Sequence, residues 1–203
     1  MIDPTSAFAS GVALLHLILL ACVYFGEDSA RSAYVSTVLS SVAFFCLLLS
    51  IVVLAEAMLA VAYIFLQGGP VCRIYMGTLL AALAMAGWAT LASITSDQDG
   101  HQAGAVIFVA ASVAYSAIFL AKAMRYKVFL NAMWTLTILA AILYIAFYVQ
   151  GMKDAAALAE WISFTLQAAT FLIFFWTNPL SEYPLKKQAT SGPETAMPLL
   201  QQA

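Results

Sequence analysis

Apolar residues form long uninterrupted stretches along nearly the whole chain, and short polar turns separate them. A helix that crosses a bilayer needs about 20 predominantly apolar residues, because hydrocarbon leaves its backbone groups no partners outside the helix. Six stretches meet this requirement, at residues 7–25, 34–66, 74–94, 102–124, 128–149 and 155–176. The pattern therefore predicts an all-α fold, a polytopic transmembrane bundle of six helices within residues 1–178.

The polar interruptions predict where these helices end. The stretch 34–66 is longer than a bilayer requires, so we expect one helix that tilts or projects before Gly68-Gly69-Pro70 ends it. Asn178-Pro179 should end the last helix, since proline lacks the backbone donor that a helix needs. Residues 179–203, rich in proline, serine, threonine and glutamine, read as a flexible cytoplasmic tail.

Composition strengthens the membrane assignment and excludes one class of partner. Hydrophobic residues make up 64% of the chain and charged residues 9%, whereas a soluble domain has roughly half and a quarter. A net charge of -2 without a large basic cluster predicts no binding of nucleic acid. Cys22, Cys46 and Cys72 lack metal-binding or disulfide spacing and are expected to be buried small apolar residues.

The distribution of lysine and arginine predicts the orientation, because these residues remain on the cytoplasmic side. Six spans place both termini and the second and fourth loops on one face. That face carries Arg73, Lys122, Arg125, Lys127, Lys186 and Lys187, and the other carries only Arg31 and Lys153. Both termini are therefore predicted to be cytoplasmic. Lys122, Arg125 and Lys127 either contact anionic lipid, at ~1 kcal/mol for each charge, or only set the topology.

Glu56 is the carboxylate placed deepest in an apolar stretch. A charge near the bilayer centre costs at least ~3 kcal/mol, so Glu56 needs a partner, a proton or water there. One interpretation is an ion, proton or ligand site facing the bundle interior, with Tyr63 one heptad away on the same face. The other is that the long second helix slides until Glu56 lies near the cytoplasmic interface.

A second group of polar residues is expected at the outer face. His101 and Tyr115 share a face of the fourth helix, and Glu160 and Trp161 lie one turn into the sixth. A contact from His101 to Glu160 would form a polar lock or bind a headgroup or ion. The simpler interpretation is helix capping by the carboxylate and interfacial anchoring by the indole.

No cofactor is predicted. His16 lies alone among leucines and isoleucine, and haem ligation between spans would need a second buried histidine, so we expect a packed or interhelical hydrogen-bonding side chain. Retinal would need a lysine deep in a span, and Lys122 is in a final turn. No catalytic set is recognisable in the sequence. A lipid-modifying enzyme remains an alternative, if His101, Glu160 and Asp97 or Asp99 surround a lipid-sized cavity.

Two stretches resemble the DRAM/FRAG/Sfk superfamily of six-span membrane proteins. Gly100-His101-Gln102-Ala103-Gly104-Ala105, with Phe108 and Tyr115 following, is similar to its "H-x-x-G-A" entry to the fourth span, and Glu160-Trp161 to its "E-W" entry to the last. The loop Gly26 to Ala33 is shorter than the family's first outer loop.

The resemblance implies a non-enzymatic accessory or scaffold protein of the plasma membrane or endolysosomes. Such a protein would engage membrane lipids and partner membrane proteins, in lipid organisation, autophagy or modulation of a channel complex. A proton-coupled transporter using Glu56 is the alternative from another class.

Overall fold

A computed structural model of the chain describes residues 3–26, 43–93 and 99–179. Within these ranges it consists of helices and turns, without strands, and every helix is long and apolar enough to cross a membrane. The helices are α1 (Pro4–Gly26), α3 (Ala43–Leu66), α4 (Val71–Ser93), α5 (Asp99–Leu120), α6 (Lys127–Val149) and α7 (Lys153–Thr177). The predicted all-α bundle of six spanning helices is confirmed.

The helix ends differ from the predicted ones mainly between α5 and α6. α5 ends at Leu120, not at Met124, because the chain tightens into a turn in which the Ala123 amide donates to the Leu120 carbonyl at 2.9 Å. Tyr126 takes a left-handed backbone conformation with φ 53° immediately before α6. Lys122 and Arg125 therefore lie in this connection, and Lys127 opens α6.

The turn after α3 follows the sequence expectation. α3 ends at Leu66, and Gly68 and Gly69 have φ values of 63° and 125°, which glycine adopts without steric cost. The expected N-terminal part of this span, residues 34–42, lies outside the described residues, as does the tail from residue 180 onward.

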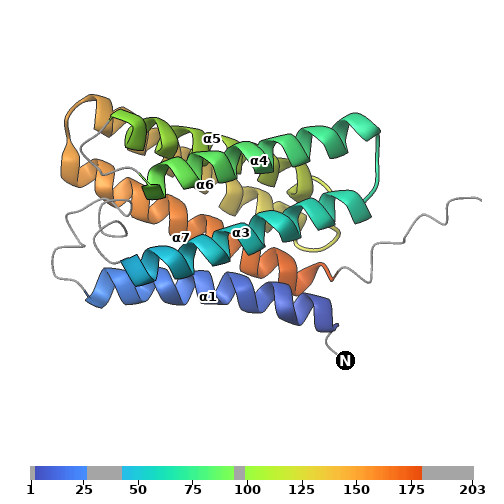
Figure 1. Ribbon diagram of the computed structural model, residues 1–203. Coiled ribbons are helices and arrows are strands. Elements are labelled where there is room, and N and C mark those ends of the chain that lie inside the picture. The colour runs from blue at the N-terminus through green and yellow to red at the C-terminus, as the bar shows by residue number, and fades with distance from the viewer. Residues whose placement is uncertain (1–2, 27–42, 94–98, 180–203) are drawn as a thin grey trace, which may run out of the picture.

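Successive helices of the six run in opposite directions along the bundle (Figure 1). α1 begins and α7 ends at the same end of the bundle, which we call the terminal end, and the opposite end is the distal end. α1 packs against both α3 and α7, and α3 also contacts α5. α7 has the highest buried share of the six, so it forms the centre of the bundle.

Aromatic rings fill the space between α7 and the helices opposite it. Phe119 of α5 meets Phe174 at a centroid distance of 4.8 Å, and Tyr63 of α3 meets the same ring at 5.1 Å. Nearer the distal end, Phe108 meets Phe164 at 5.6 Å. Such edge and tilted contacts are the favoured geometries of aromatic pairs. Bulky rings thus hold α5 against α7.

α4 and α5 instead touch through their backbones. A Cβ atom added to Gly87 would lie 2.5 Å from the Phe108 nitrogen, and one added to Gly104 would lie 2.8 Å from the Leu91 nitrogen. Small residues at a helix crossing allow this close approach, which supplies packing energy that lipid does not compete for. Gly104 of the "H-x-x-G-A" segment therefore has a structural role at the α4–α5 crossing.

Candidate functional site

Glu56 pairs with His16 in the interior of the bundle. The two side chains come from the middle of α3 and the middle of α1, and each is only 2% exposed. His16 Nδ1 and Glu56 Oε2 are 2.9 Å apart, a normal hydrogen-bond distance. The interhelical hydrogen bond expected of His16 is confirmed. Glu56 is buried in the middle of α3 and faces the bundle interior, and its depth relative to the cytoplasmic interface stays a prediction.

The other two polar atoms of this pair have no partner in the described part of the chain. His16 Nε2 and Glu56 Oε1 are both buried, and neither has a hydrogen-bond partner among the described residues. Tyr115 of α5, 2% exposed, lies within electrostatic range of Glu56. An unpaired polar atom in a protein interior costs about 1–3 kcal/mol. Nε2 and Oε1 are therefore each able to form a further hydrogen bond.

The four residues predicted to form a site at the outer face do not form one cluster. Tyr115 follows His101 by about four helical turns, or roughly 21 Å along α5, and its ring packs against Phe171 in the core. Tyr115 therefore belongs with Glu56 and not with His101. The reason is that side chains on one helix face point in the same direction but can lie far apart along the helix axis.

His101, Glu160 and Trp161 are all buried at the distal end, where α5 and α7 begin. The contact between Phe108 and Phe164 sets the two helices in register. By helical rise, His101 lies about 10 Å beyond Phe108 and Glu160 about 6 Å beyond Phe164, so their backbones differ in depth by only about 4–5 Å. Both residues take part in interactions. A direct bond between them stays a prediction.

The enzyme alternative also needed Asp97 or Asp99. Asp97 lies outside the described residues, as does the side chain of Asp99, so that arrangement stays a prediction. In the described part of the chain no three histidine, cysteine or carboxylate side chains gather closely enough to hold a metal ion. Cys22 and Cys72 are exposed and Cys46 is half-buried, which corrects the expectation that all three are buried.

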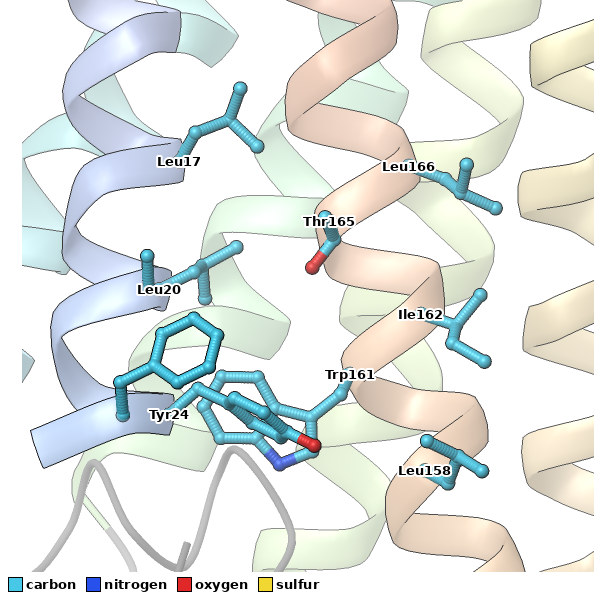
Figure 2. A pocket seen from close by; sticks show the side chains of 10 residues that line it. Leu17, Leu20, Tyr24, Leu158, Trp161, Ile162, Thr165 and Leu166 are labelled. Atoms are coloured by element: carbon cyan, nitrogen blue, oxygen red, sulfur yellow. The ribbon is translucent and has the colours of Figure 1, made fainter. Parts of the chain in front are cut away.

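Trp161 lines an apolar groove between α1 and α7 (Figure 2). Its ring meets that of Tyr24 in an edge-on contact with a centroid distance of 5.2 Å. These two aromatic side chains lie toward the distal end, and Leu17 lies deeper in the groove. The volume is about 400 Å³, within the usual range for a small-molecule site. The remaining lining residues are Leu20, Ala21, Phe25, Leu158, Ile162, Thr165 and Leu166.

A second apolar groove, of about 600 Å³, lies on the other side of α7, against α6. Its α6 wall includes Leu136, Leu139 and Leu143. Leu158, Ile162 and Leu166 line both grooves, and Leu158 and Ile162 are 52% and 44% exposed. These three side chains form a ridge along α7, which we call the α7 ridge, with one groove on each flank.

Arg73 binds three helices together at the terminal end. From the first turn of α4, its guanidinium donates to the Ile64 carbonyl of α3 at 3.3 Å and to the Ile118 carbonyl of α5 at 2.7 Å. It also donates to the Gly68 carbonyl at 2.8 Å and to Gln67 Oε1 at 2.6 Å, in the turn after α3. Gln67 in turn donates to the Phe119 carbonyl at 3.0 Å. From the sequence alone, Arg73 indicated only the orientation of the bundle. The clustering of a guanidinium and an amide around Gly68-Gly69-Pro70 was the available hint.

Asn178 likewise links the end of α7 to the connection after α5. Its side chain is fully buried, and Oδ1 accepts hydrogen bonds from the Met124 and Arg125 amides at 2.7 and 2.9 Å. Nδ2 donates to the Phe174 carbonyl at 3.3 Å. The connection that carries Lys122 and Arg125 is therefore held against α7. Lys122, Arg125 and Lys127 are all exposed there, and their contact with anionic lipid stays a prediction.

Replacing Asn178 by alanine should loosen this connection. Two backbone amides would lose their acceptor, at a cost of about 1–3 kcal/mol, so hydrogen exchange at Met124 and Arg125 should accelerate. Exchange measured by mass spectrometry in nanodiscs would show it. Asn178→Asp, which keeps the acceptor oxygen, is the matched control. Equal exchange in Asn178→Ala and the unmodified protein would show that the side chain does not hold the connection.

Comparison of the chain with protein-family models, with curated proteins and with solved structures finds no match. The geometry supports a polytopic, six-span membrane protein with a buried His16–Glu56 pair and two apolar grooves along α7.

Proposed function

We propose that this protein is a non-enzymatic accessory or scaffold protein that binds membrane lipids through the two grooves beside the α7 ridge. The proposal accords with the resemblance to the DRAM/FRAG/Sfk superfamily and with its lipid-related roles. The observation that carries it is the pair of apolar grooves that share one wall, formed by Leu158, Ile162 and Leu166.

The shape of the grooves favours a lipid with two acyl chains. Each groove is lined almost entirely by apolar side chains, and the ridge between the two grooves is one helix wide. One chain can follow Leu17 along α1 while the other follows Leu139 along α6. The headgroup would then lie near the distal end, beside Tyr24 and Trp161, because such amphipathic rings favour the membrane interface.

The scaffold role would use surfaces that the bundle leaves apolar. Large side chains on α3 and α4 such as Phe44, Met58 and Tyr75 are exposed, and they face either lipid or a partner membrane protein. A lipid seated along α7 leaves these helices available. We propose that partners bind there, in the plasma membrane or in endolysosomal membranes, and that the bound lipid contributes to the selectivity of the complex.

Filling the α1–α7 groove should reduce lipid binding. Ala21→Trp places an indole in a groove whose lining includes this alanine, so fewer lipids should remain bound after purification in mild detergent. Native mass spectrometry would count the retained lipids. Ala89→Trp on α4 is the matched control, because Ala89 is exposed and lies similarly close to the distal end of its helix but lines neither groove.

The unmodified protein and Ala89→Trp should retain a two-chain lipid that Ala21→Trp largely loses. Retention of the same lipids by all three proteins would contradict binding in this groove. Recovery of the unmodified protein free of both lipid and partner proteins would contradict the proposed function as a whole.

A further inference from the structure

The His16–Glu56 pair is a titratable unit enclosed in the membrane-spanning part of the bundle. An imidazole and a carboxylate together carry a net charge of −1, 0 or +1, depending on whether they hold no, one or two exchangeable protons. Any net charge in hydrocarbon is costly, whereas the one-proton state is neutral overall. The 2.9 Å separation of Nδ1 and Oε2 accommodates a single proton between the two groups.

In the one-proton state, Nε2 and Oε1 can each form a further hydrogen bond, whichever atom carries the shared proton. If Nδ1 holds it, the imidazolium donates to the carboxylate, and if Oε2 holds it, the carboxylic acid donates to the imidazole. In both forms Nε2 retains a hydrogen and Oε1 retains its lone pairs. These are the two buried atoms without a partner among the described residues. A water molecule bonded to either atom would have a direct route for exchanging the proton.

The described groups around the pair would not neutralise a net charge on it. Tyr115 approaches Glu56 from α5, and Tyr63 follows on α3 itself. The titratable side chains of α4 are Cys72, Arg73 and Tyr75, at the terminal end of that helix. α7 contributes neutral Gln167 and Thr170 at mid-depth, and its charged residues Lys153, Asp154 and Glu160 all lie in its distal part. Cys22 and Tyr24 of α1 also lie toward the distal end.

We propose that His16 and Glu56 form a proton-binding site inside the bundle. The ligand is one proton, held between Nδ1 and Oε2 and exchanged with water through Nε2 and Oε1. The site lies where α1 packs against α3, so the protonation state of the pair acts on this helix contact. The inference is independent of lipid binding along α7. A proton-coupled carrier using Glu56 would need this same site.

Infrared difference spectroscopy of the protein in nanodiscs tests the proposal. Protonated carboxylic acids absorb separately from carboxylates, and the pH is stepped between about 4 and 9, a range that includes the ordinary values of carboxyl and imidazole groups. The expected result is a carboxylic acid band whose intensity changes with pH. Glu56→Gln should abolish it. His16→Gln should change how the band responds to pH, because it removes the imidazole that shares the proton with Glu56.

Two further variants keep the test decisive. Glu160→Gln removes a buried carboxylate from α7, whereas Glu56 lies on α3, and it should leave the pH-dependent band in place. The exchanged variant, with His16→Glu and Glu56→His, should restore a titrating band if Glu56→Gln alone disturbs the fold. A band that does not change with pH, or that survives in Glu56→Gln, would overturn the proposal. Lipid retention is expected to be the same in Glu56→Gln and the unmodified protein, so the two proposals can fail separately.

Discussion

Alanine in place of Gly104 is expected to lower the stability of the bundle by about 1–3 kcal/mol, and leucine by more. The new Cβ would lie 2.8 Å from the Leu91 nitrogen and 2.9 Å from the Gly87 carbonyl oxygen, both of which are backbone atoms of α4. Neither can rotate away as a side chain would. α4 and α5 would have to separate along their whole crossing, and thermal unfolding in mild detergent would show the loss.

Gly11→Ala is the matched control for this substitution. Gly11 also lies within a spanning helix, but a Cβ there meets nothing within 4 Å. Its replacement should leave stability unchanged or slightly improved, since alanine favours a helix over glycine. Gly87→Ala should behave like Gly104→Ala, because its Cβ would lie 2.5 Å from backbone. Equal unfolding temperatures for Gly11→Ala and Gly104→Ala would contradict the backbone contact.

Leucine in place of Arg73 is expected to cost several kcal/mol, the largest effect of any single side chain at the terminal end. The substitution leaves the Gly68 and Ile118 carbonyls and Gln67 Oε1 without a charged donor, and hydrogen bonds to charged groups contribute about 1.5–3 kcal/mol each. The guanidinium would then no longer link α3, α4 and α5. Proteolysis near the terminal end and thermal unfolding should both report the change.

Arg73→Lys separates the charge from the geometry. An ammonium keeps the positive charge but lacks the planar fork that reaches α3 and α5 together, so an intermediate loss is expected. Lys153→Gln, which removes an exposed cation at the start of α7, should have little effect. If Arg73→Lys were as stable as the unmodified protein, charge alone would account for the role of Arg73.

The architecture was readable from the sequence because hydrocarbon permits few alternatives. Long apolar stretches can cross a bilayer only as helices or closed barrels, and the stretches here have helical length. Gly68-Gly69-Pro70 and Asn178-Pro179 also end their helices as predicted. The end of α5 was misplaced because the stretch beyond Leu120 is still partly apolar, and only the local turn at Ala123 shows that the helix has stopped.

The pairing of His16 with Glu56 could not be predicted from the sequence alone. The two residues are 40 positions apart, and their contact depends on how α1 and α3 are rotated about their own axes. Helices that are apolar all round carry little information about which face is turned inward. Each residue is therefore unusual in the sequence, but nothing in the sequence indicates that the two meet. The grooves beside α7 depend likewise on the spacing between helices, which no local pattern records.

The central position of α7 has a consequence for biosynthesis. Chains enter the membrane in sequence order, so α1 to α6 reach the bilayer before the helix that supplies Phe164, Phe171 and Phe174 to their shared interior. Until α7 inserts, Tyr63, Trp88 and Phe119 must turn toward lipid or toward one another. The arrangement of these rings is thus completed after translation has passed the last span, and a chain that stalls before residue 153 would present an incomplete interior to membrane quality control.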